Sequence, residues 1–145
     1  MKNQTLATLG TLALLTAGTA FAQQRLSVDV PFEFSFASRV MPAGHYDVTR
    51  TGGVLEIHDY SARAGAMATV QDVDIRKGRI APSGLAFNKY GDKYFLAEAW
   101  NSDGAEWGVA ASKSKAEREI AHVTADVARV TIPARTGAVT LLSLK

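Results

Sequence analysis

Cysteine is absent from the 145-residue chain. Its absence excludes disulfide bonds, a cysteine nucleophile and a lipid anchor attached through a cysteine. The stability of the fold must therefore come from burial of apolar surface, without covalent cross-links.

An excess of one charge is also missing. The chain has 16 Lys and Arg residues against 14 Asp and Glu residues, and its longest basic run is the pair Arg76–Lys77. Nucleic-acid binding normally requires a basic patch or stripe. We therefore expect no nucleic-acid partner.

Long apolar runs are confined to the start of the chain. Lys2 precedes an apolar run over residues 6–17, and Ala20 and Ala22 supply the small side chains of a signal-peptidase site. The run is shorter than the roughly 20 residues that a membrane-spanning helix needs. The sequence therefore predicts a signal peptide over residues 1–22 that is cleaved after Ala22.

The mature chain, residues 23–145, is expected to be a single domain in the periplasm or outside the cell, with no transmembrane anchor. Apolar and polar residues alternate in several short segments, most clearly over residues 28–36, where three phenylalanines share one parity. The segment Met41-Pro42-Ala43-Gly44 is typical of a turn, in which Gly44 is free to adopt a positive φ.

One segment has helical spacing instead. Ser114 and Glu117 form a capping box, and Ala116, Ile120 and Val123 recur at helical intervals, which predicts a helix near residues 113–122. Many short strands with one helix indicate a mainly β fold. We expect a small antiparallel β-sandwich or barrel of seven to eight strands with one short α-helix.

Three motifs in this order suggest a relationship: "VDVPFEFSFASRVMPAGHYDV", "LAFNKYGDKYFLAEAW" and "SKSKAEREIA". Together they cover much of residues 28–122. The chain resembles a family of small, uncharacterised exported β proteins of Acidobacteria and similar soil bacteria. That resemblance implies a compact exported β domain and assigns no activity.

The sequence offers no catalytic or metal-binding constellation. His45, His58 and His122 lack the close spacing that is typical of metal ligands, although His58 and Asp59 beside Asp47 leave open a weak metal site. There is no Gly-x-Ser-x-Gly motif for nucleophilic catalysis. We therefore expect no enzyme activity, no catalytic residue, no metal and no cofactor.

The most informative charge is Glu98. The two-residue loop Gly91-Asp92 predicts a β-hairpin in which Phe87 pairs with Leu96 and Leu85 pairs with Glu98. This register places the carboxylate on an apolar face, where an unpaired charge would be costly. Glu98 therefore either reaches water at the rim of the sheet or lines a cavity.

If Glu98 lines a cavity, Tyr94 and Trp100 are its candidate neighbours in a ligand-binding site. Trp107 is a further aromatic residue that could line such a cavity.

The leading hypothesis is an exported, non-enzymatic interaction or structural module that acts in the envelope or outside the cell. It would contact another envelope or extracellular protein through its surface or a strand edge; Pro31 in the first strand suits such an edge. The alternative is a small-molecule carrier with its ligand inside a β-barrel, near Glu98, Tyr94 and Trp100. A closed barrel with a roomy apolar interior favours the carrier, and a dry core favours the interaction module.

Overall fold

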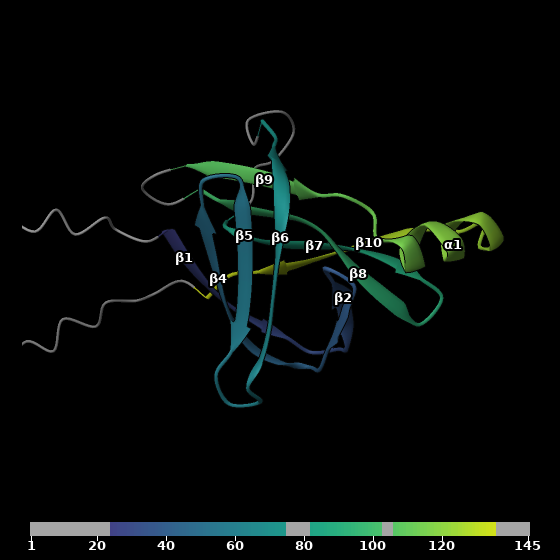
Figure 1. The fold of residues 1–145 in the computed structure, drawn as a ribbon, viewed down its shortest axis with the longest axis horizontal. Coiled ribbons are helices and arrows are strands. Elements are labelled where there is room, and N and C mark those ends of the chain that lie inside the picture. The colour runs from purple at the N-terminus through teal and green to yellow at the C-terminus, as the bar shows by residue number, and fades with distance from the viewer. Residues whose placement is uncertain (1–23, 75–81, 103–105, 136–145) are drawn as a thin grey trace, which may run out of the picture.

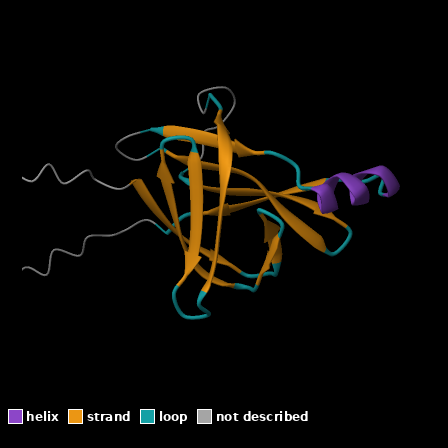
Figure 2. Cartoon of the chain, viewed as in Figure 1, coloured by secondary structure: helices purple, strands orange, loops and turns teal. Residues whose placement is uncertain are grey.

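The computed structural model describes residues 24–74, 82–102 and 106–135. The predicted signal peptide and its cleavage site after Ala22 lie outside these residues. The described residues form ten strands and one helix, so this part of the chain is mainly β, as the sequence predicts (Figure 1, Figure 2). No helix within them is long and apolar enough to cross a membrane.

The strands follow one another along the chain before and after the single helix. They are β1 (Gln24–Val30), β2 (Phe34–Phe36), β3 (Arg39–Met41), β4 (Gly44–Thr51), β5 (Val54–Asp59), β6 (Ala64–Asp72), β7 (Gly84–Tyr90), β8 (Lys93–Asn101), β9 (Trp107–Ala111) and β10 (Ala128–Pro133). The helix, α1 (Lys115–Val123), projects from one end of the sheet in Figure 1.

All ten described strands belong to one sheet. Its order is β1-β4-β5-β6-β9-β8-β2-β3, and β7 and β10 branch from β8. The sheet is not closed. A single main-chain hydrogen bond, from the Arg135 N–H to the Ser27 carbonyl at 2.7 Å, links the chain after β10 to β1. The pair β2–β8 is parallel. The predicted antiparallel sandwich or barrel of seven to eight strands is therefore confirmed only as a mainly β fold, with a sheet of about ten strands.

The alternating segment over residues 28–36 is two strands instead of one. The first strand, β1, ends directly before Pro31, which has no N–H to donate, and β1 pairs with β4. The second, β2, turns back into β3 through Ala37 and Ser38, whose φ angles are +51° and +61°. These left-handed angles are uncommon for residues other than glycine, so local preference does not predict this turn.

The inward side chains of the strands form one apolar cluster. Phe34 packs edge-to-face on both Tyr46 and Phe87, with ring centroids 5.2 Å apart in each pair. The buried cluster comprises Leu26, Val28, Val30, Phe34, Phe36, Met41, Tyr46, Val48, Leu55, Ile57, Ala66, Leu85, Phe87, Leu96, Ala99, Trp107 and Val109. The residues that the alternating pattern places on the apolar face of each predicted strand thus supply most of the core.

Candidate functional site

The strand β6 pairs with a different strand on each of its two edges, and neither partner covers its full length. On one edge its first six residues, Ala64–Thr69, pair with β5. On the other edge β9 pairs only with Val70–Asp72. The second edge of residues 64–69 therefore has no strand partner among the residues that the structure describes.

The direction of the main-chain groups along β6 follows from two hydrogen bonds. The Val70 N–H donates to the Gly53 carbonyl on the β5 side, and the Val73 N–H donates to the Gly108 carbonyl on the β9 side; both distances are 2.9 Å. Because successive residues of a strand direct these groups to opposite edges, the odd-numbered residues of β6 face the β9 side.

Three odd-numbered residues, Gly65, Met67 and Thr69, therefore direct their N–H and C=O groups toward the open edge. Arg39 Nη1 donates to the Gly65 carbonyl at 3.2 Å. Met67 and Thr69 have no strand partner on this side within the described part of the chain. An edge with free donors and acceptors is a template for another strand.

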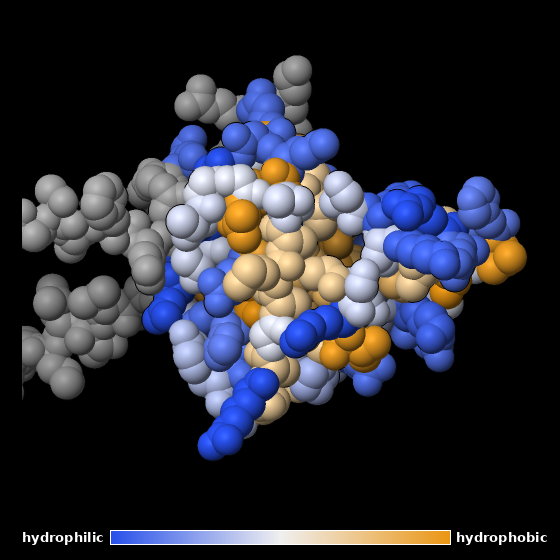
Figure 3. All heavy atoms as spheres, in the orientation of Figure 1, coloured by the Kyte–Doolittle hydropathy of each residue, from blue (hydrophilic) through white to orange (hydrophobic). Residues whose placement is uncertain are grey.

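Two surface hollows border this edge. One, of about 420 Å³, lies beside Ala66 and Met67 and reaches across to Glu56 and His58 of β5. The other, of about 210 Å³, lies beside Ala68 and Thr69. Both hollows also border Ala37, in the turn of the β2–β3 hairpin. An apolar surface runs over β6 in Figure 3. We call the open edge and these two hollows the β6 notch.

A larger hollow of about 600 Å³ lies between the β2–β3 hairpin and α1. It shares Ser35 and Phe95 with the smaller hollow of the β6 notch. We call it the helix trough. Its lining residues are Phe32, Glu33, Phe34, Ser35, Val40, Asp92, Lys93, Tyr94, Phe95, Ala116, Glu119, Ile120 and Val123.

One wall of the trough, α1, is attached to the sheet through a buried carboxylate. Glu117 is only 3% exposed, and its Oε1 atom accepts hydrogen bonds from Asn88 Nδ2 at 2.9 Å and the Tyr90 hydroxyl at 3.1 Å. Burial, together with the Glu117 carboxylate, raises the pKa of Tyr90. The tyrosine therefore stays protonated at neutral pH and can donate this bond. Ser114 caps the helix by accepting from the Glu117 N–H, as predicted.

The apolar stripe of α1 borders the trough. An amphipathic helix ordinarily buries this stripe against the core. Here Ala116, Ile120 and Val123 line the helix trough, and Val123 is 84% exposed. Val40, also a lining residue, is 65% exposed on β3. Apolar groups on the helix and on the hairpin are thus available to contact an occupant of the trough.

The predicted register of the β7–β8 hairpin is correct only from the loop up to Phe87, because the pairing is irregular between Phe87 and Ala86. Phe87 pairs with Leu96, as predicted, but the register then shifts, so that Ala86 pairs with Glu98 and Leu85 pairs with Ala99. The predicted pair of Leu85 and Glu98 is therefore wrong. A bulge gives one strand an extra residue and moves the following side chains to the opposite face, an effect that alternation cannot predict.

The three predicted ligand residues do not come together. Tyr94 lines the helix trough and stacks on Phe32, with ring centroids 3.7 Å apart. Glu98 forms an ion pair with Arg129 at 2.8 Å, and its side chain is 19% exposed. Trp100 is buried, and its Nε1 atom donates to the Pro82 carbonyl at 2.9 Å. Only Tyr94 borders any of the three hollows described above.

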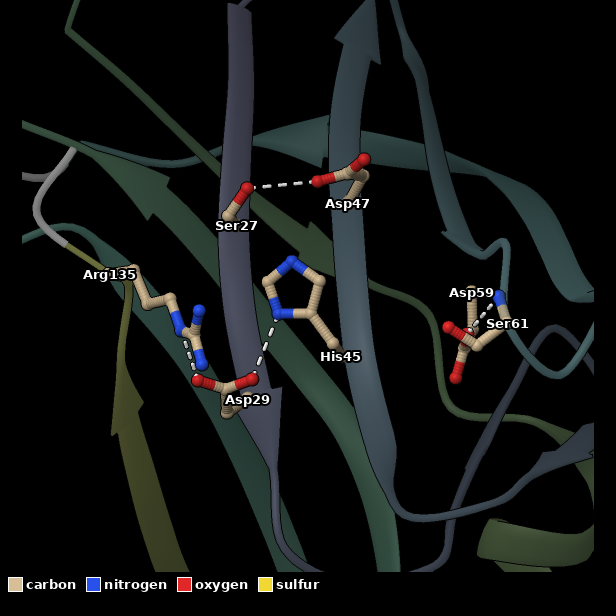
Figure 4. A network of polar contacts seen from close by, with 7 residues as sticks. All are labelled: Ser27, Asp29, His45, Asp47, Asp59, Ser61 and Arg135. Atoms are coloured by element: carbon tan, nitrogen blue, oxygen red, sulfur yellow. Dashed lines mark hydrogen bonds and ion pairs between the residues drawn. The ribbon is translucent and has the colours of Figure 1, made fainter. Parts of the chain in front are cut away.

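A polar network lies on β1 and β4 (Figure 4). His45 Nδ1 is 2.8 Å from Asp29 Oδ1, and Arg135 forms an ion pair with the other Asp29 oxygen. These two partners, His45 first, lower the pKa of Asp29. On the neighbouring part of the strands, Ser27 donates to Asp47 at 2.9 Å. The network joins β1 to β4 and to the chain after β10.

The residues of the possible metal site are divided between two environments. Asp47 and His58 are cross-strand neighbours on β4 and β5. Asp59 is buried and accepts from the Ser61 N–H at 2.8 Å, apart from Asp47 (Figure 4). Within the described residues, no group of three or more His, Asp or Glu side chains could hold a metal ion.

No family model, curated protein or solved structure matches the chain. The resemblance drawn from its motifs stays a prediction. The β6 notch and the helix trough are the surface features of the described residues that could bind a partner.

Proposed function

We propose that the protein is an exported, non-enzymatic interaction module, and that it binds an extended segment of another envelope or extracellular protein as an additional strand on β6. The observation that carries this proposal is the outward direction of the main-chain groups of Met67 and Thr69 along an edge bordered by two hollows. Strand addition of this kind obtains affinity from main-chain hydrogen bonds and specificity from alternate side chains.

The position of β9 defines where the added strand would lie. Ala111, the last residue of β9, pairs with Val70, so an added strand would continue the line of β9 beside residues 64–69. The edge of residues 64–69 is about 20 Å long at roughly 3.3 Å per residue, and Arg39 of β3 already occupies its Gly65 carbonyl. Each main-chain hydrogen bond contributes on the order of 0.5–1.5 kcal/mol, so a few such bonds give appreciable affinity.

Two observations favour this function over a carrier with its ligand inside a barrel. The sheet is not closed, and the inward side chains of the described strands pack into one cluster. The apolar run and the small residues before Ala22 support export.

The proposal is tested with Met67→Pro and, as its matched control, Met67→Leu. Proline removes the N–H that faces the notch but leaves the β5 ladder unchanged, and it is tolerated on open edges. The probe is a random library of displayed peptides of about twelve residues, which reach about 40 Å when extended. Peptides selected on the exported protein should bind the leucine variant normally and the proline variant at least about tenfold more weakly.

The control also separates side-chain from main-chain effects, because both variants replace the exposed Met67 side chain. Urea unfolding of the two variants checks that each is folded. Equal affinity of folded proline and leucine variants for every selected peptide would contradict strand addition at β6.

A further inference from the structure

We infer that the partner's segment extends past the β6 notch into the helix trough, and that it carries bulky apolar residues there. This inference rests on the proposed strand addition and adds a second, side-chain-specific half to the binding site. The partner is then a polypeptide with two adjoining parts, an extended part along β6 and an apolar part under α1.

The smaller hollow of the β6 notch adjoins the helix trough at the place where a chain leaving β6 would pass. The smaller hollow reaches from Ala68 and Thr69 to Glu117, and it meets the helix trough at Ser35 and Phe95. A segment paired with β6 as far as Thr69 is therefore beside the entrance of the trough.

The chemistry of the trough selects apolar side chains. Phe95 and the stacked pair Phe32 and Tyr94 contribute aromatic surface, and Ile120 contributes aliphatic surface from α1. The volume of about 600 Å³ lies within the range of roughly 300–1,000 Å³ that is usual for ligand sites, and it has room for several large side chains.

The exposed valines on its walls show what an occupant would cover. Val40 and Val123 both line the trough from opposite elements, yet they are 65% and 84% exposed. A peptide that rises above the walls would bury both, because its side chains enter the trough while its main chain stays at the surface. Removing such apolar surface from water favours binding.

The charges of the lining add a second constraint. Three carboxylates, those of Glu33, Asp92 and Glu119, accompany the single ammonium group of Lys93. One of these carboxylates, that of Glu119, also has an ion pair with Lys115 on the same helix, in which Oε1 and Nζ are 3.8 Å apart. Acidic residues in the apolar half of the partner would be repelled by this lining. We therefore expect selected peptides to combine bulky apolar residues with an absence of Asp and Glu in that half.

The test uses peptides selected on the unchanged protein and a matched set of valine variants. The double variant Val40→Gln and Val123→Gln makes both walls polar. Val127→Gln is the control, because Val127 is 51% exposed and lines none of the three hollows. The double variant should bind at least about tenfold more weakly, and the control should bind normally. Alanine at the bulky apolar positions of the peptide should have the same effect as the double variant.

The outcomes separate this inference from the function on which it rests. If Met67→Pro weakens binding while the double valine variant and the alanine peptides bind normally, the trough is not part of the site and the inference is wrong. If the valine variant weakens binding while Met67→Pro has no effect, strand addition at β6 is refuted, although the trough still binds the peptide. A small apolar molecule that copurifies and competes with the peptides would also overturn the inference, since the trough would then hold a small ligand.

Discussion

Removing the Glu117 carboxylate should detach α1 from the sheet while the core stays folded. Glu117 is 3% exposed and accepts two hydrogen bonds, from Asn88 at 2.9 Å and Tyr90 at 3.1 Å. Hydrogen bonds to a charged group contribute about 1.5–3 kcal/mol each, and the cost of burying the carboxylate offsets part of this sum. We expect Glu117→Ala to reduce the free energy that holds α1 on the sheet by about 2–3 kcal/mol. Glu117→Gln, which keeps one acceptor oxygen, should lose about half as much.

Hydrogen exchange measured by mass spectrometry reports this local effect directly. Peptides that cover Lys115–Val123 should exchange faster in Glu117→Ala, while peptides from β4 and β5 should be unchanged. Glu119→Ala is the matched control, because Glu119 is an exposed carboxylate of the same helix. Unchanged protection of α1 in Glu117→Ala would show that contacts other than the Glu117 carboxylate hold the helix on the sheet. The same variant should weaken peptide binding in the helix trough.

Three further predictions concern the turns and the polar network. Gly44→Ala should destabilise the fold by about 1–3 kcal/mol in urea unfolding, because its Cβ would overlap the Oδ2 atom of buried Asp59. Ser38→Gly should raise the free energy of unfolding in the same assay by about 0.5–1 kcal/mol, because the φ of +61° suits glycine. Asp29→Asn should remove a stabilisation that is present above pH 4. The pKa of Asp29 is lowered from 3.8 in the folded state, so the difference in stability from the unchanged protein should shrink as pH falls below about 4.

The local alternation and spacing of apolar residues predict those features of the fold that depend on residues close together in the chain. The parity of the phenylalanines in residues 28–36 identified most of the inward side chains of β1 and β2, and the Gly91-Asp92 loop correctly predicted that Phe87 pairs with Leu96. The capping box correctly predicted a helix that begins after Ser114. Each of these features is fixed within a few residues of chain.

Features that depend on distant contacts were not predictable in this way. Gly44 suggested a positive φ, but its φ is not positive, and its lack of a side chain instead leaves room for Asp59, which follows on the next strand. The shift in register before Glu98 requires knowledge of both strands. The spacing of Ile120 and Val123 predicted a helix, but it could not show that this stripe would border a surface hollow.

The candidate site had only an indirect signal in the sequence. The segment that became β6, "AGAMATVQD", is rich in small residues, and its two faces are poorly distinguished. This composition is consistent with a strand that leaves space beside it. Whether its edge is open depends on where β9 ends, at Ala111, far along the chain. No local pattern carries that information.

The exchange rates of four amides, measured by NMR, show whether one edge of β6 is open and accepts a strand. In the free protein, the amides of Met67 and Thr69 should exchange quickly, and those of Ala66 and Ala68, which face β5, should exchange slowly. Addition of a selected peptide should slow the exchange of Met67 and Thr69 and leave the other two amides unchanged. Slow exchange of Met67 and Thr69 in the free protein would mean that this edge is not open, because their N–H groups would already be hydrogen-bonded.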